Sequence, residues 1–284
     1  MSGEGALIGA GVAGSGVLWP AAGAGLVGGA LVGMTGVGAG SVIAAALLLL
    51  YPEMAPQVIV GSATIQAVAM KCVGVAARRQ FRLREGRIGV AMAAGAIPLA
   101  VAGAWASSFV PGATLRSVLT LVLVVVGVLL VIQAMAGEAG AGVGVGVGAG
   151  AGAGAGVADP VVGDPGPARV GVLGAAVGFI AGLTSVGTGT LFVSALAGPL
   201  RVDAHRAVAA ALVAGMLTLV VSGATHALLG HFDVAIVMGT VLGSIPGVLL
   251  GTAVSHRLPA RALRGVIGAG IAAAAIVSMA RVGK

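Results

Sequence analysis

One stretch decides the fold of this chain, and it occurs twice: MTGVGAGS at residues 34–41 and LTSVGTGT at residues 183–190. The match continues along both halves, because GAIP at residues 95–98 corresponds, after one gap, to GSIP at residues 243–246. Two such long segments do not align by chance with a single gap. The sequence therefore indicates a duplicated structural unit.

The composition of the chain indicates that its solvent is lipid. The sequence is 58% hydrophobic and only 8% charged, with a mean hydropathy of +1.14, whereas an average soluble domain carries roughly 25% charged residues. The 52 glycines suit helices that pack closely through small residues. We expect a multi-pass protein of the plasma membrane. A duplicated apolar chain with a Gly-rich break in each half is typical of secondary transporters.

The basic residues exclude one class of partner and predict an orientation. The net charge is +7, but no basic face with interleaved aromatic residues is visible, so nucleic acid is not an expected partner. The basic residues lie mostly between apolar runs, at 78–87 in the first half and at 201–206 and 257–264 in the second. If all of them face the cytoplasm, each unit crosses the membrane an odd number of times. The two units are then inverted, and the Gly-broken element is a re-entrant hairpin.

Apolar runs define the expected helices. A bilayer core needs roughly 20 apolar residues in a helix, and the runs lack the alternation typical of strands. Each half opens with an apolar stretch that the Gly-rich motif interrupts. The expected elements are about 21–50, 57–77, 88–109 and 114–136, then about 170–200, 204–230, 232–255 and 261–280. The predicted fold is an all-α polytopic membrane protein. It has about eight transmembrane elements in two homologous four-element repeats, each opening with a broken or re-entrant helix.

Three regions follow from this pattern. Residues 1–136 form the first transmembrane repeat, with an apolar N-terminal extension near 5–20, and residues 169–284 form the second. Residues 137–168 between them are rich in Gly, Ala and Val. Because each Gly costs a helix roughly 1 kcal/mol relative to Ala, we expect a flexible linker. The alternative is that this uncharged segment lies in or across the membrane.

The two Gly-rich motifs are the strongest chemical signal. Unwound backbone at membrane depth is tolerated only where it is buried in protein or lines a cavity. A break exposes helix-end N–H groups, which suit an anion, and hydroxyls add further donors. The alternative is a close-packing glycine patch that binds no ligand. The substrate-binding residues that we expect here are Thr35, Gly36, Gly38, Gly40, Ser41, Thr184, Ser185, Gly187, Gly189 and Thr190.

Lys71 stands inside the otherwise apolar run from Val58 to Ala77. A charge within a membrane helix is costly, so it usually faces a cavity or a partner. We therefore expect Lys71 to supply positive charge to the path of an anion. The alternative is a lysine whose ammonium extends to the membrane interface beside Arg78 and Arg79.

The remaining polar residues do not predict catalysis. His226, His231 and Asp233 lie close together at a helix junction, but a metal site would need a further ligand. We expect capping and interface roles for them, and no metal. No pairing of a nucleophile with a base is visible, nor the Asp/Asp pairing of an intramembrane protease. We therefore expect no enzymatic activity and no cofactor.

Taken together, these motifs resemble the TauE/SafE sulfite exporter family. The resemblance implies a permease of duplicated four-helix units for sulfite, sulfonates or related small organic anions, with a recurrent lysine at the position of Lys71. It covers nearly the whole chain outside the linker. The stretches that carry it are TGVGAGS at 35–41, Lys71 with Gly74, Gly95 with Pro98, TSVGTGT at 184–190, residues 226–233 and GSIPG at 243–247.

The chain departs from the family pattern in two respects. Relatives commonly carry three consecutive glycines at the first break, where this chain has Ala39, and a proline shortly afterwards, where it has alanines at 44–45. Many relatives also carry an acidic residue at the start of the next helix. This chain has Ala63 there in the first half and alanines at 209–211 in the second. The lost acidic pair implies a different coupling ion or a different substrate.

The predicted function is a permease that moves a small anion, sulfur-containing or a carboxylate, by alternating access between two homologous halves. Its expected partners are the lipid bilayer, the anion and a coupling ion, either a proton or sodium. An anion channel with a continuous pore and a non-transporting membrane scaffold are the alternatives. The resemblance implies transport without naming the transported anion.

Overall fold

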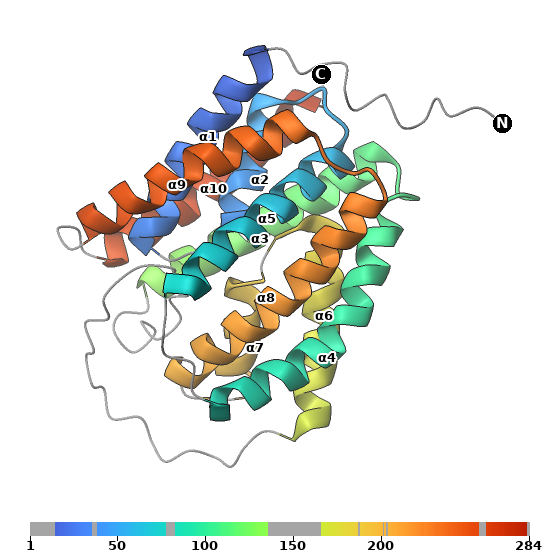
Figure 1. The fold of residues 1–284 in the computed structure, drawn as a ribbon, viewed down its shortest axis with the longest axis vertical. Helices are drawn as coiled ribbons and strands as arrows, with labels where there is room; N and C mark the ends of the chain where they lie inside the picture. The colour runs from blue at the N-terminus through green and yellow to red at the C-terminus, as the bar shows by residue number, and fades with distance from the viewer. Residues whose placement is uncertain are drawn as a thin grey trace.

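The computed structural model describes residues 15–35, 39–77, 83–135, 166–186, 188–200, 202, 204–255 and 260–282. Over these residues the chain forms ten helices and no strand, which confirms the all-helical prediction (Figure 1). The helices are α1 (Ser15–Thr35), α2 (Ala39–Leu50), α3 (Pro56–Ala77), α4 (Leu83–Ala106), α5 (Gly112–Met135), α6 (Pro167–Thr184), α7 (Thr190–Ala197), α8 (Ala204–Leu228), α9 (Val234–Ser255) and α10 (Ala260–Val282).

Six of these helices are long and apolar enough to cross a membrane, namely α1, α4, α5, α6, α8 and α9. The sequence predicted about eight transmembrane elements. The other two expected elements correspond to α3 and α10, which have 22 and 23 residues. In α10 the described side chains form a shorter apolar helix, Gly265–Ser278.

The first Gly-rich motif separates α1 from α2, and the two helices form a hairpin. The phenol of Tyr51, just after α2, donates a hydrogen bond of 2.7 Å to the carbonyl oxygen of Val17 in the first turn of α1. The chain therefore enters and leaves this hairpin at the same end of the molecule. Part of the expected N-terminal extension belongs to α1, which begins at Ser15 and contains Pro20. A proline inside a helix removes one backbone hydrogen bond, and α1 continues past Pro20 to Thr35.

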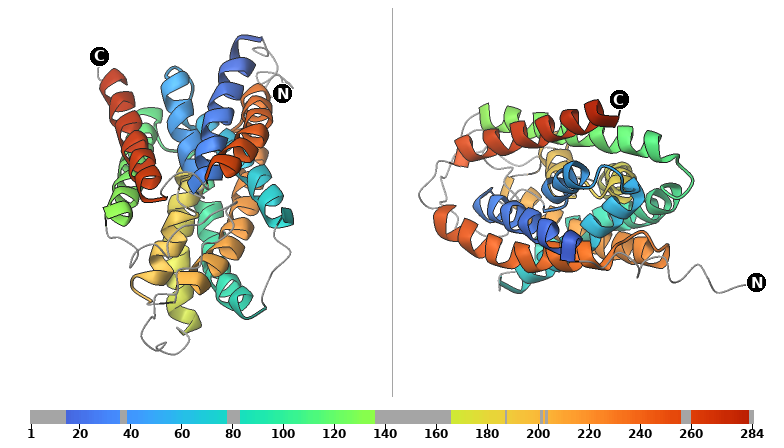
Figure 2. Two further views of the ribbon diagram at one scale, coloured as in Figure 1. Left: turned by 90° about the vertical axis from the view of Figure 1, so that its left-hand side faces the viewer. Right: turned by 90° about the horizontal axis from the view of Figure 1, so that it is seen from above.

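The second Gly-rich motif separates α6 from α7, and this hairpin enters from the opposite end. In Figure 1, α6 begins at the lower edge, where α8 also begins, and it ends in the middle of the molecule. The left view of Figure 2 agrees, with α1 and α2 in the upper half and α6 in the lower half. The two broken elements therefore approach each other at mid-height.

Hydrogen bonds join several helix ends at the top of Figure 1, and we call this end of the molecule the upper end. The side-chain amide of Gln57 at the start of α3 donates to the carbonyls of Ser107 and Val110 after α4, both at 3.3 Å. At the start of α5, Arg116 Nη2 donates to the carbonyl of Met54 at 2.9 Å. The junctions α2–α3 and α4–α5 therefore lie side by side.

Two helix pairs pack backbone against backbone through glycines. On α9 the glycines recur every four residues, and a Cβ on any of them would collide with a carbonyl oxygen of α1. Glycines with the same spacing on α6 face the carbonyl oxygens of α4. Van der Waals packing of this kind is the main source of helix association in lipid. The facing pairs are Gly239–Leu18, Gly243–Ala22, Gly247–Leu26 and Gly251–Ala30, then Gly174–Met92, Gly178–Ala96 and Gly182–Ala100.

Two apolar clusters fill the interior. One is centred on α2 and includes Ile43, Leu47 and Leu123, with α5 and α10 packed antiparallel beside it. The other is centred on α7 and includes Phe192 and Leu196. Seen from above in Figure 2, α5 and α10 form one long side of the bundle and α9 forms the opposite side. The region between the two clusters is where the helix breaks lie. The predicted linker at 137–168 falls outside the described residues, except for its last three.

Candidate functional site

The second break has a defined geometry because Ser185 ends α6 in a left-handed conformation. Its φ is 60° and its ψ is 0°, and its N–H donates to the carbonyl of Ala181 at 2.7 Å. Thr184 Oγ1 donates to the carbonyl of Ile180 at 2.7 Å and accepts from the N–H of Val186 at 3.3 Å. Left-handed backbone is unfavourable for a residue with a Cβ, so the surrounding packing holds Ser185 in place. The helix therefore stops in the interior of the protein.

The first break meets the second at Gly40. A Cβ built on Gly40 would lie 2.6 Å from the carbonyl oxygen of Ser185 and 3.6 Å from its hydroxyl. The start of α2 therefore contacts the end of α6, as expected if both motifs belong to one site. Of the other expected residues, Gly36, Gly38 and Gly187 lie outside the described residues, and so does the side chain of Thr35.

Lys71 lies at the second break and is almost completely buried, with 6% of its surface exposed. A Cβ on Gly215 of α8 would contact Lys71 Nζ and would lie 3.0 Å from the carbonyl oxygen of Thr188. The lysine therefore reaches across α8 to the backbone of the second Gly-rich motif. Its ammonium is buried inside the described part of the protein.

Several buried polar atoms at the breaks have no hydrogen-bond partner among the described residues. They include Lys71 Nζ and the hydroxyls of Ser185 and Thr190. A buried polar group without a partner is costly, and a buried charge more so. Such groups are explained when a ligand supplies the partner. These three are donors that an anion would satisfy.

The helix ends at the breaks add oriented backbone dipoles. The N-termini of α2 at Ala39 and of α7 at Thr190 point into the same interior region as the buried hydroxyls of Ser41 and Thr190. A helix N-terminus carries partial positive charge and free N–H donors. The region therefore combines a lysine, hydroxyls and two helix N-termini.

Three residues at or near the candidate site were not predicted from the sequence. Thr188 belongs to the repeated motif, but only its backbone carbonyl marks it as part of the site. Gly215 is one of 52 glycines, and no local pattern distinguishes it. Gln66 Nε2 donates to Ser244 Oγ at 2.9 Å, and Ser244 Oγ donates to the carbonyl of Gly25 at 3.2 Å. This chain of hydrogen bonds joins α3 to α9 and α1.

The cluster at the junction of α8 and α9 has the capping role expected for Asp233. Its carboxylate Oδ1 accepts from the N–H of Ile236 at 3.0 Å in the first turn of α9, and its own N–H donates to Ser62 Oγ at 3.0 Å. Throughout the described ranges, no group of three or more His, Cys, Asp or Glu side chains could hold a metal ion.

Comparison with known proteins identifies the family of this chain. Residues 21–278 match the family described as Sulfite exporter TauE/SafE. Part of the chain is also similar to the "Probable membrane transporter protein YjnA" of Bacillus subtilis (strain 168), with 36% identity over 93 residues. That match covers 33% of this chain and 37% of the relative, so the chain spans little more than a third of the relative's length. No solved structure matches the chain.

The family match extends over nearly all the described helices, from α1 to α10. Together with six helices able to cross a membrane, it identifies a multi-pass membrane protein of a transporter family, which is not a family of enzymes. The chain belongs to the TauE/SafE sulfite exporter family of membrane transporters.

Proposed function

We propose that this transporter carries a small anion, sulfite, a sulfonate or a related organic anion, by alternating access, and binds it where the two helix breaks meet. The observation that carries the proposal is the unpaired, buried Lys71 Nζ beside the second break. An anion that leaves water loses its hydration, and only charge and oriented donors replace it. The family also implies an anion such as sulfite.

The binding residues in this proposal are those that donate. Lys71 supplies the charge, Ser185 and Thr190 supply hydroxyl donors, and the start of α2 around Gly40 and Ser41 supplies backbone N–H groups. The proposed site also includes the remaining residues of the two motifs, namely Thr35, Gly36, Gly38, Thr184, Gly187 and Gly189. Transporters of other folds place anionic groups at the N-termini of broken helices in the same way.

Flux into proteoliposomes tests the proposal, with labelled sulfite, sulfoacetate and short carboxylates as probes. A carrier shows flux that saturates with the concentration of the anion. Flux that rises linearly would favour a channel, because a continuous pore needs no occluded site. If no anion crosses faster than in protein-free liposomes, the protein is a membrane scaffold and the proposal fails.

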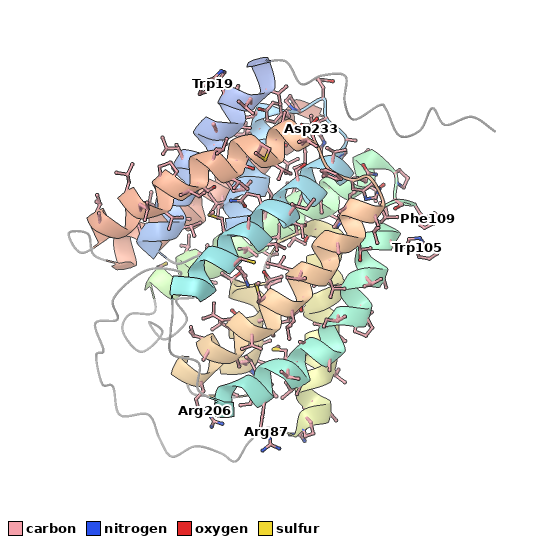
Figure 3. All side chains as sticks on the ribbon, in the orientation of Figure 1. Trp19, Arg87, Trp105, Phe109, Arg206 and Asp233 are labelled. Atoms are coloured by element: carbon pink, nitrogen blue, oxygen red, sulfur yellow. The ribbon has the colours of Figure 1, made fainter. Side chains whose placement is uncertain are left out.

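We also propose that the two halves are inverted with respect to each other. Supporting this, the α1–α2 hairpin opens at the upper end, whereas α6 begins at the lower end (Figure 1). Figure 3 shows Arg87 and Arg206 at the lower edge of the molecule, Trp19 at the upper edge, and Trp105 and Phe109 at the right-hand edge. A concentration of arginine on one side of the membrane is a signal of orientation, because basic residues favour the cytoplasmic side.

Cysteine accessibility tests the inversion. In a Cys72→Ser background, Arg82→Cys from the first half and Arg261→Cys from the second should react with an impermeant reagent from the same side of the membrane. Ser108→Cys, at the upper end, should react from the other side. Labelling of positions 82 and 261 from opposite sides would mean parallel halves and would exclude the inversion.

A further inference from the structure

The end of α8 brings two histidine rings into contact at the upper end. The N–H of His231 donates to the carbonyl of His226 at 2.9 Å, and the N–H of Gly230 donates to that of Ala227 at 3.1 Å. Gly230 has a φ of 71°. This is a Schellman motif, which ends a helix with a left-handed residue and brings the side chains at its two ends together. Here those side chains are imidazoles, with ring centroids 5.6 Å apart.

The hydrogen bonds of the pair fix where the protons lie. His226 is fully buried, and its Nε2 lies 2.9 Å from the carbonyl oxygen of Gly182. A carbonyl only accepts, so Nε2 carries a proton and Nδ1 of the neutral ring is bare. That Nδ1 lies 3.4 Å from His231 Nδ1, which must therefore donate. His231 Nε2 is then the acceptor that faces the exposed Ser108 hydroxyl at 3.5 Å.

The result is a single line of donors and acceptors from the surface to the interior. It runs from Ser108 on the α4–α5 turn, through His231 and His226, to Gly182 in the last turn of α6. Gly182 comes three residues before Ser185, which ends the helix at the second break. A charge placed on His226 therefore acts on the helix end that forms part of the proposed anion site.

We infer that His226 and His231 form the coupling-proton site of this transporter, which takes up a proton at the upper end and holds it against the C-terminal end of α6. This inference rests on the proposed function and names the coupling ion for it. A proton from water binds His231 Nε2, and His231 then passes its Nδ1 proton to the bare Nδ1 of His226. His231 ends neutral and protonated on Nε2, and His226 ends as an imidazolium.

The imidazolium has a favourable partner at that position. Its Nε2–H bond to the Gly182 carbonyl becomes charge-assisted, and the C-terminal end of a helix carries partial negative charge. The same end of α6 closes the second break at Ser185. Protonation of His226 therefore stabilises one arrangement of this helix end, which links proton binding to anion binding.

The other ionisable groups described around α8 lie away from this hydrogen-bonded path, so the two histidines are its proton acceptors. On α3, Lys71 approaches α8 at Gly215, eleven residues before His226, which is roughly 16 Å along a helix. At the upper end, the carboxylate of Asp233 accepts the hydrogen bond that caps α9. Asp233 lies next to the α2–α3 junction, which carries Tyr51 and Glu53. The groups on α4 and α6 belong to the first turns of those helices, at their lower ends, and α7 has none. They are Arg84, Glu85 and Arg87 on α4 and Arg169 on α6.

Nitrogen NMR of the detergent-solubilised protein with 15N-labelled histidine tests the proton positions without any transport. His→Gln variants assign the four histidines. At neutral pH, His226 should show a protonated Nε2 and a bare Nδ1, and His231 the opposite tautomer. Replacing His231 by Gln should shift the titration of His226. A His226 ring with a bare Nε2, or one whose titration ignores His231, would overturn the inference.

Transport measurements test the coupling. The probe is methanesulfonate, whose charge does not change near neutral pH, together with a pH dye inside the vesicles. His226→Gln keeps a donor toward Gly182 but cannot hold a proton. It should retain exchange of labelled methanesulfonate at equal pH. Accumulation of methanesulfonate driven by a pH gradient should fall about tenfold or more, which is within the range of measured couplings. Proton entry, reported by the dye, should fall equally.

Controls separate the outcomes of this experiment. If His226→Gln does not insert, His231→Gln, on the half-buried junction, replaces it in this experiment and should show the same loss. His205→Gln, in the first turn of α8, should behave as the parent does. If the variants keep gradient-driven accumulation, the inference fails while the proposed function stands. If the parent protein moves neither methanesulfonate nor sulfite, the proposed function fails, and the NMR result still decides the proton positions.

Discussion

The two broken helices of this transporter contribute different chemistry to the place where they meet. The α6–α7 turn carries buried hydroxyls at Thr184, Ser185 and Thr190, and Lys71 points its ammonium at this turn. From the α1–α2 hairpin, Gly40 contributes a backbone surface that touches Ser185. The α6–α7 hairpin therefore supplies most of the described hydroxyls. The α1–α2 hairpin supplies a close approach of the backbone and the buried hydroxyl of Ser41.

The largest effect should come from separating the two hairpins. In Gly40→Val, the new side chain would meet the Ser185 carbonyl, which is backbone and cannot move aside. We expect a loss of about 1–3 kcal/mol of stability from overpacking and loss of measurable anion flux. Thermal unfolding and proteoliposome flux are the measurements.

Gly23→Val is the matched control, because a Cβ on Gly23 would meet nothing within 4 Å. It should insert and transport as the parent does. A Gly40→Val protein that transports normally would mean that contact between the breaks is unimportant.

The next largest effect concerns the charge that the first unit brings to the second break. Lys71→Gln should insert but lose flux by about tenfold or more, since a hydrogen bond to a charged group contributes about 1.5–3 kcal/mol. Lys71→Arg keeps the charge and should retain part of the flux. Saturation curves for sulfite measure both.

Cys72→Ser, at the exposed neighbouring position, controls for disturbance of α3. Full flux in a well-inserted Lys71→Gln protein would remove this residue from the site and leave the hydroxyls as its only polar groups.

A smaller effect should come from the hydroxyl of the second break. Ser185→Gly removes Oγ while favouring the left-handed backbone, which costs a residue with a Cβ roughly 1 kcal/mol or more. We expect equal or higher thermal stability together with flux reduced by about two- to tenfold, the value of one neutral hydrogen bond.

Ser117→Ala, at an exposed helix position, is the control and should change neither property. If Ser185→Gly is more stable and transports as fast as the parent, the hydroxyl contributes nothing to binding, and the two breaks differ less than their side chains suggest.

The smallest effect concerns pH at the upper end. Burial lowers the pKa of His231 from its ordinary value of 6.5, so the folded protein disfavours the protonated ring. The stability that this neutral ring contributes is therefore complete above pH 6.5. It declines as the pH falls from there to the lower folded pKa.

The expected loss is below about 1 kcal/mol because the ring is half-exposed. It should appear as a lower melting temperature at pH 5 than at pH 7. His231→Gln should flatten this dependence and His205→Gln should not. An unchanged slope in His231→Gln would assign the pH dependence to another group.

The sequence predicted the elements of this fold better than their contacts. The repeated motif indicated where two helices are interrupted, because closely spaced glycines weaken a helix wherever they occur. It could not predict that Gly40 touches Ser185, since this contact depends on how two hairpins from distant parts of the chain approach each other. It also could not single out Gly215, whose importance comes only from the lysine that packs against it.

The candidate site remains a prediction, and the sequence is most informative where one residue type is unusual in its surroundings. Lys71 is conspicuous inside an apolar run, so its burial could be anticipated, whereas its approach to the second break depends on the packing of α3 against α8. The pairing of His226 with His231 was expected only as a capping or interface feature. Its geometry depends on the left-handed Gly230, and a glycine in this sequence is too common to signal a helix end.

The glycine contacts between α1 and α9 and between α4 and α6 have a consequence for the history of the protein. Each hairpin packs on a helix of the other half, so a single half would leave those glycine faces against lipid. If the two halves descend from one ancestor, as the repeated sequence indicates, these faces would have required two copies of that ancestor to pack together. Gene fusion would then have joined two chains that already associated through their glycines.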